Sequence, residues 1–286
     1  MFRFSHEELA RSVLEMSSLP PTTVRLTGLI ASDEIDLDQV VHVIECDPGL
    51  TFKLLRIANS VSSSSCRRIG TVKEALIRLG TGAVLGVAIG SCMRPIVMKV
   101  IPGYNISGTD FWRHSLTAAL ATESMRTFSK TQFSQLAFTA ALMHDIGKLL
   151  LGKTLDPETV KDLADAGFSG DSDSHRTEFE VLSLHHGGVG GMVARYWGMP
   201  DTIANGVTFH HEPELCQDEI ARIVRLADYV AHVVNLDRVN ATNPKRQPED
   251  LNTPDDAKQL GLSDASLSKV INATRLRLTA VAAEFN

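Results

Sequence analysis

"AALMHDIGKLLLG", residues 140–152, places a histidine and an aspartate side by side inside an apolar stretch. Leucine, methionine and isoleucine flank the pair on both sides. Burying an ionisable group costs several kcal/mol unless the group is paired, hydrogen-bonded or bound to a metal. His144 and Asp145 therefore require partners from elsewhere in the chain.

The apolar residues around this stretch recur at helical spacing, as they do in most of the chain. The segment "DLDQVVHVIECDPGLTFKLLRIANS" (36–60) carries its valines, leucines and isoleucines at steps of three and four. Asp36 suits the N-cap of a first helix, and Pro48 suits the first turn of the next one. Alternating strand-like runs are almost absent and aromatic residues make up 6%. The sequence therefore predicts an all-α fold.

Two polar stretches suggest how the helices are organised. "IPGYNISGTD" (101–110) separates a first helical block from a long helix expected to begin near Phe111. We place a boundary there, between an N-terminal helical part (1–105) and a second helical part (106–286). The stretch 240–256 holds three prolines and no apolar face, so we expect an exposed loop before a closing C-terminal helix.

Composition narrows the class of protein. The 286 residues are 43% hydrophobic and 22% charged, with a formal net charge of -6, which is the balance of an ordinary globular protein. No global positive field favours nucleic acid. The longest apolar region, 83–101, is interrupted by Arg94 and Lys99 and contains two glycines, so it falls short of a membrane span. Four cysteines lie far apart without a CxxC spacing. We expect a cytoplasmic protein that binds neither nucleic acid nor membrane.

Seven residues after position 110 are candidate metal ligands, since each is a histidine or aspartate in or beside an apolar helical pattern. They are His114, His144, Asp145, His186, His210, His211 and Asp228. Imidazole and carboxylate donors without a thiolate suit a catalytic cation rather than a thiolate-bound structural zinc. We expect one or two divalent transition-metal ions, with Fe, Mn or Ni ahead of Zn or Mg.

The spacing of these residues suggests that they form two metal sites. Adjacent helical residues point about 100° apart, so His144 and Asp145 can share an ion only over the groove beside a close neighbouring helix. Small residues nearby permit that approach: Ala137, Ala140, Ala141 and Gly147. The histidines at 186, 210 and 211 can hold a second ion, with Asp145 bridging two ions about 3.5–4 Å apart.

Two further residues complete the candidate site. Asp145 and Lys148 are the candidate catalytic residues, and Lys148 can neutralise a phosphate oxygen. Glu212 can orient one of the histidines from outside the ligand shell. Plainer interpretations stay open: Asp228 can cap a helix or pair with Arg225, Lys148 can be solvated, and the histidine pairs can be polar surface.

Several motifs together resemble a known family. The order His114, His144–Asp145, Asp228 and the segment "ALMHDIGKLLL" resemble the HD superfamily of metal-dependent phosphohydrolases. "LPPTTVRLTGLI", "DPGLTFKLLRIANS", "IGTVKEALIRLG" and "EFEVLSLHHGGVGGMVARYWGMPDTIANGVTFHH" resemble the HDOD family, the HD-related output domains of bacterial signalling. The resemblance covers about residues 15–235.

The resemblance implies an N-terminal helical part packed on a five-helix HD core. It aligns His186, six residues after Glu180, with the family's single histidine, rather than His185. It also implies that all seven ligand positions are kept, including the trio that the related HD-GYP phosphodiesterases use for a second ion. "GGVGG" (187–191) replaces their Asp-Gly-x-Gly-Tyr-Pro segment, which argues against hydrolysis of cyclic di-GMP.

Two functions compete. The first is a signalling protein that is also a metal-dependent phosphohydrolase, acting on a phosphoester such as a nucleotide derivative. The second is a non-catalytic regulatory module that binds a partner protein or a ligand, with a structural or sensory metal. Di-iron oxygen chemistry, which some HD-superfamily proteins perform on similar ligands, is a third and weaker hypothesis.

Overall fold

The computed structural model describes residues 11–16, 18–32, 34–60, 68–97, 101, 103–104, 106–131, 133–166, 168, 174–242 and 255–285. Within these ranges the regular secondary structure is helical, and one isolated antiparallel bridge joins Ile101 to Ile106. The predicted all-α fold is confirmed.

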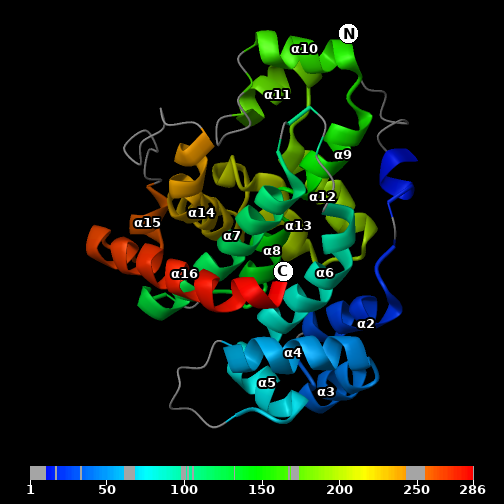
Figure 1. Cartoon of the computed structure of the whole chain (residues 1–286), viewed down its shortest axis with the longest axis vertical. Helices are drawn as coiled ribbons and strands as arrows, with labels where there is room; N and C mark the ends of the chain where they lie inside the picture. Colours follow the sequence, from blue (N-terminus) through cyan, green and yellow to red (C-terminus); the bar gives the residue numbers. More distant parts are fainter. Residues whose placement is uncertain are drawn as a thin grey trace.

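Most helices of the N-terminal part lie at one end of the molecule, and its last helix runs from there into the middle (Figure 1). Its helices are α2 (Pro21–Ile30), α3 (Leu37–Glu45), α4 (Pro48–Ser60), α5 (Val72–Leu79) and α6 (Thr81–Val97). Asp36 caps α3 as predicted, because its carboxylate accepts from the backbone N–H groups of Asp38 and Gln39. Pro48 begins α4, also as predicted.

The second part contains the helices that carry the candidate ligands. They are α7 (Gly108–Phe128), α8 (Ala137–Met143), α9 (Ile146–Thr154), α10 (Pro157–Asp165), α11 (Ser174–Leu182), α12 (His186–Tyr196), α13 (Asp201–Phe209), the 3-10 turn η1 (Pro213–Leu215), α14 (Ile220–Thr242), α15 (Asp256–Gln259) and α16 (Asp264–Phe285). The long helix expected near Phe111 begins at Gly108, because the Ser107 side chain accepts from the N–H of Asp110.

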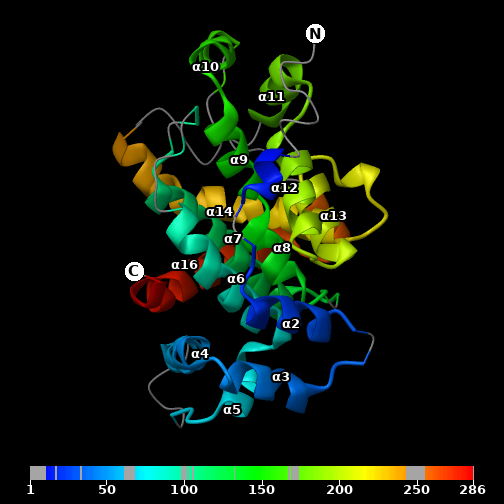
Figure 2. The same cartoon turned by 90° about the vertical axis from the view of Figure 1, so that its right-hand side faces the viewer.

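One hydrophobic core joins the two parts. Helix α7 packs against α8, α14 and α16, and α6 packs against α2, α7 and α8 (Figure 2). The approach of α6 is close: a methyl group at Gly86 would lie 2.5 Å from the Phe138 ring, and one at Gly90 would lie 2.9 Å from Trp112. The core therefore runs across the predicted boundary at 105, and the division into two parts stays a prediction.

The His144–Asp145 pair lies between two helices rather than inside one. Helix α8 ends at Met143 and α9 begins at Ile146, so the continuous apolar helix expected through the pair is wrong. The chain turns at the pair, which lets both side chains leave the backbone toward the same interior. Both are buried, with 1% of His144 and 4% of Asp145 exposed.

The polar stretch 240–256 lies only partly within the described residues. Its first residues continue α14 to Thr242, its last belong to α15, and the loop expected over 243–254 lies outside the described residues. Among the described helices, no single one is long and apolar enough to cross a membrane, although α5 and α6 together, bent by 107°, pass that test of length and composition.

Gly147 is the point of closest approach between α9 and α12. A Cβ atom at Gly147 would lie 2.0 Å from the carbonyl oxygen of His186 and 2.7 Å from the backbone nitrogen of Gly190. We expect Gly147→Ala to lower the free energy of unfolding by roughly 3 kcal/mol, because the two helices must separate. Chemical denaturation followed by tryptophan fluorescence measures the change.

Gly188→Ala is the matched control, because a Cβ atom there meets nothing within 4 Å. This substitution in the first turn of α12 should leave stability unchanged or raise it by up to about 1 kcal/mol. Equal destabilisation by the two alanines would contradict the close contact at Gly147.

Arg225 does not pair with Asp228; it anchors α15 instead. Its guanidinium donates two hydrogen bonds to Asp256, whose carboxylate is fully buried, and two more to the exposed Glu214. We expect Asp256→Ala to lower the free energy of unfolding by about 3 kcal/mol, because the guanidinium of Arg225 loses its buried partner. Glu214→Ala, which removes the exposed acid from the same arginine, should cost less than about 1 kcal/mol. Thermal unfolding of both variants tests the contrast.

Candidate metal centre

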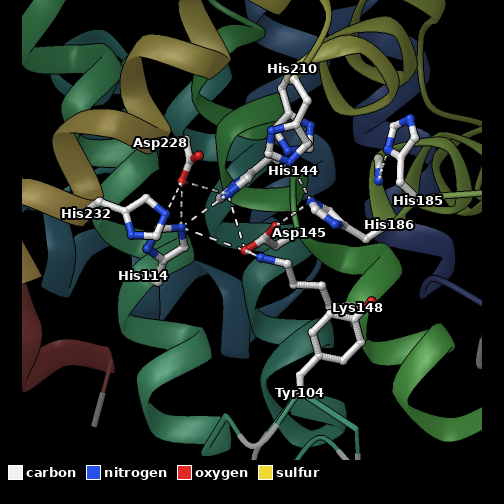
Figure 3. Close-up of polar contacts among 12 residues, drawn as sticks. Tyr104, His114, His144, Asp145, Lys148, His185, His186, His210, Asp228 and His232 are labelled. Carbon is white, nitrogen blue, oxygen red and sulfur yellow. Dashed lines mark hydrogen bonds and ion pairs between the residues drawn. The ribbon is translucent and has the colours of Figure 1, made fainter. Parts of the chain in front are cut away.

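The first group of predicted ligands meets where α7, the α8–α9 turn and α14 come together (Figure 3). The Nε2 atom of His114 lies 2.9 Å from Asp228 Oδ1 and 3.3 Å from His144 Nε2. Asp145 Oδ2 lies 3.4 Å from His144 Nε2 and 3.8 Å from His114 Nε2. Three segments that are distant in sequence thus direct two imidazoles and two carboxylates at one point.

These separations match the edges of a coordination polyhedron. Two donor atoms that each lie about 2.1 Å from one ion are about 3.0 Å apart at an octahedral edge and about 3.4 Å apart at a tetrahedral edge. The distances from His114 and His144 to Asp228, 2.9 and 3.5 Å, fall in or next to this range. The group can therefore hold a cation with little movement.

The second group contains the three remaining predicted histidines. The Nε2 atoms of His186 and His211 are 2.8 Å apart, and donor atoms of His186, His210 and His211 all lie within 4.8 Å of one another. These residues come from the first residue of α12 and from the turn after α13. Helices α12 and α13 pack on each other, which brings the three rings together.

Asp145 links the two groups. Its Oδ2 atom faces His144 and His114, whereas its Oδ1 atom lies 3.3 Å from His186 Nε2. A carboxylate with its two oxygens directed at two sets of imidazoles is the arrangement of a bridging ligand. Asp145 thus lies between the two groups, and its role as a bridging ligand stays a prediction.

Hydrogen bonds at Nδ1 decide which ring nitrogen faces the site. His144 Nδ1 lies 2.8 Å from the carbonyl oxygen of Ala141, and His210 Nδ1 lies 2.7 Å from that of Val207. A carbonyl oxygen only accepts, so each Nδ1 carries the proton and donates it. The Nε2 lone pairs of both rings are then left for a metal.

Glu178 does the same for His186, and the sequence analysis missed it. Its carboxylate is fully buried and lies 2.8 Å from His186 Nδ1; it also accepts from the His186 backbone N–H at 2.6 Å. The hydroxyl of buried Tyr104 donates to the same carboxylate at 3.1 Å. The spacing of residues in the sequence could have revealed Glu178. It stands four residues before Leu182, so both side chains lie on the inward face of α11, and both are buried.

The two glutamates that the sequence analysis named, Glu212 and Glu180, do not hold the ligand histidines. The structure gives the orienting role expected of Glu212 to Glu178, because Glu212 is half exposed and its Oε2 atom lies 3.9 Å from His185 Nε2. Glu180, which the family resemblance used as a reference point, is exposed. His185 caps α12 by accepting the N–H of Gly187, and thus lies outside both groups of ligands.

Lys148 is buried and paired, so its interpretation as a solvated side chain is wrong. Its ammonium donates to Asp145 Oδ2 at 2.9 Å. Burial disfavours the charge, but the carboxylate of Asp145 outweighs it and raises the pKa of Lys148. A fixed positive charge therefore lies beside the candidate bridging ligand.

The electrostatics favour the protonation states that ligate metals. Burial opposes ionisation of Asp145 and Asp228, yet the surrounding imidazoles, with Lys148 at Asp145, hold the pKa of both carboxyls well below its usual value. Burial, reinforced by neighbouring imidazoles, holds the pKa of His210 and His211 well below the usual value. Burial disfavours the charge on His144, but Asp145 and Asp228 outweigh it and raise the pKa of that imidazole. The site thus combines two carboxylates that stay ionised with two imidazoles, His210 and His211, that favour the neutral form in which they bind metals.

Two buried atoms test whether these residues fit a metal. Among the described side chains, His210 Nε2 and Asp228 Oδ1 are buried without a hydrogen-bond partner, although each points at other polar groups. An unsatisfied buried acceptor costs about 1–3 kcal/mol, and more when it is charged. A cation shared with the neighbouring donors satisfies both atoms. The imidazole and carboxylate set therefore fits one or two divalent ions.

Comparison with known proteins places the chain in a family. The HDOD domain family matches residues 16–213. An uncharacterized protein of Treponema pallidum (strain Nichols) is 20% identical over 209 residues, and the match spans 71% of this chain but only 39% of that protein.

Solved structures share the fold. A "Putative phosphohydrolase" from Shewanella amazonensis SB2B has a TM-score of 0.70 at 22% identity, covering 97% of this chain and 98% of that one. An HDOD domain protein with unknown function from Geobacter sulfurreducens has a TM-score of 0.61 at 19% identity, covering 96% and 93%. A "Putative signal transduction protein" from Marinobacter aquaeolei VT8 has a TM-score of 0.68 at 20% identity, covering 99% and 62%. With its helical fold and a family match over more than half its length, this chain belongs to the HDOD domain family.

Proposed function

We propose that this protein is a cytoplasmic HDOD-type signalling protein that hydrolyses a phosphoester, such as a nucleotide derivative, at a site holding two divalent transition-metal ions. The observation that carries the proposal is the carboxylate of Asp145, whose two oxygens face separate groups of imidazoles. Bound there, the ions would lower the pKa of a water molecule and polarise the phosphoryl group. The name of the Shewanella amazonensis SB2B neighbour, "Putative phosphohydrolase", agrees with this reaction class.

The chain's own residues would have distinct tasks. Asp145 holds the two ligand groups at a common centre, and Lys148 keeps that carboxylate charged and oriented. Lys148 also adds a positive charge that attracts an anionic phosphate. The side chains of His114 and His232 are 16% and 20% exposed, whereas His144 is 1% exposed. The substrate therefore reaches the centre from the side of α7 and α14.

Metal content is the first test. Protein purified without a chelator should carry up to two equivalents of a divalent transition metal, with iron, manganese or nickel ahead of zinc or magnesium. Asp145→Asn removes the shared carboxylate and should lower the content at least tenfold, measured by elemental mass spectrometry. His42→Gln, a change at an exposed histidine outside the site, is the matched control and should leave it unchanged. Wild-type protein that is purified without metal and cannot be loaded with divalent metal would contradict the proposal.

Turnover is the second test. The metal-loaded protein should hydrolyse a phosphodiester or phosphomonoester from a panel of nitrophenyl phosphates and nucleotides. Lys148→Met should lower kcat/KM by about 100-fold, because a buried charge beside the reacting phosphate is lost. Lys153→Met, at a lysine that is 67% exposed on the same helix, should keep full activity.

A regulatory role without catalysis is the second candidate. Phe52 on α4 and Ile77 on α5 are 64% and 72% exposed, so the N-terminal helices present large apolar side chains to solvent. Such residues are typical of surfaces that bind another protein. In this alternative the metal has a structural or sensory role. Metal-loaded protein that turns over no member of the panel would favour this second candidate over the first.

A further inference from the structure

His232 is absent from the ligand set predicted from the sequence, and it lies beyond the residues that match the family, 16–213. It stands four residues after Asp228 on α14, so both side chains leave the same face of the helix. Its Nε2 atom lies 3.3 Å from Asp228 Oδ1, and its ring centroid lies 4.6 Å from that of His114 (Figure 3). Its position at the edge of the candidate metal centre needs an explanation.

Two explanations are open for the position of His232: a hydrogen bond to Asp228, or a metal ion that both residues bind. The surroundings of Asp228 Oδ1 distinguish them. Three imidazole Nε2 atoms lie around this one oxygen: those of His114 at 2.9 Å, His232 at 3.3 Å and His144 at 3.5 Å. Despite these short distances the oxygen is buried without a hydrogen bond. A cation shared by these imidazoles and the carboxylate would satisfy the buried oxygen and the ring nitrogens together.

The span of the donors agrees with one ion. Donor atoms of His114, Asp228 and His232 all lie within 4.8 Å of one another. Opposite donors of one octahedron with bonds of about 2.1 Å are about 4.2 Å apart, and adjacent donors about 3.0 Å. The group of His114, His144 and Asp145 meets the same limit and shares His114 with it. One cation beside His114 can therefore be reached from both groups.

We propose that His232 is a fifth protein ligand of the ion held by His114, His144, Asp145 and Asp228. This inference rests on the proposed metal centre but not on its catalytic activity. It changes the donor set from two imidazoles and two carboxylates to three imidazoles and two carboxylates. The added imidazole favours Fe, Co, Ni or Zn over Mg and Ca. In a six-coordinate ion this donor set leaves one position for water or substrate.

Loading the full chain with Co²⁺ tests the assignment. Each imidazole that binds cobalt through Nε2 contributes a hyperfine-shifted Nδ1–H signal to the proton NMR spectrum, and its bonding changes the visible absorption of the ion. His232→Ala should remove one such signal, alter the visible spectrum and weaken Co²⁺ binding by about 10- to 100-fold at one of the two sites. His232→Gln, which preserves more side-chain volume, should lose the same signal, and this second variant serves if the alanine variant fails to fold.

The controls separate this inference from the proposed function. His42→Ala should keep every signal, because His42 is exposed and lies far from the ligands in the chain. An unchanged signal count and Co²⁺ affinity in both His232 variants would overturn the fifth-ligand assignment while leaving the metal centre intact. Wild-type protein that binds no Co²⁺ would overturn the metal centre and the assignment with it. Loss of the His232 signal in a protein without turnover would support the assignment and reject only the hydrolase.

Discussion

The buried carboxylate of Asp145 is the constraint on which the arrangement of the site depends. It lies between two sets of imidazoles and also accepts from the ammonium of Lys148. An anion in this position is stable only with several positive or hydrogen-donating partners around it. The helices that supply those partners must therefore pack in one particular way.

Close helix packing makes the arrangement possible. Gly147 lets the start of α12 approach α9 so closely that a methyl group would strike the backbone of His186. That contact places the His186 ring against Asp145 and allows Glu178 to hold its other nitrogen. Tyr104, just before α7, donates to the same glutamate. A chain of buried polar contacts thus connects the segment between the two predicted parts to the candidate ligands.

The direction of each imidazole is set by its second nitrogen. Backbone carbonyls fix His144 and His210, and a carboxylate fixes His186, so three Nε2 atoms face inward. The ring directions are thus held by groups outside the ligand shell, before any ion arrives. A site organised in this way loses little conformational freedom on binding a cation. The same rigidity suits either a catalyst or a sensor, which is why the two candidate functions share one structure.

The sequence by itself determined the all-α fold, and it singled out seven candidate donors that the structure brings together in two groups. Both depend on local patterns: helical spacing is a property of consecutive residues, and an acid or imidazole in an apolar run stands out without any tertiary information. Only the tertiary structure decided that Glu178 rather than Glu212 orients His186, that Lys148 is buried, and that His232 joins His114 and Asp228. These outcomes depend on the separation and rotation of packed helices, which are set by side chains far apart in the chain.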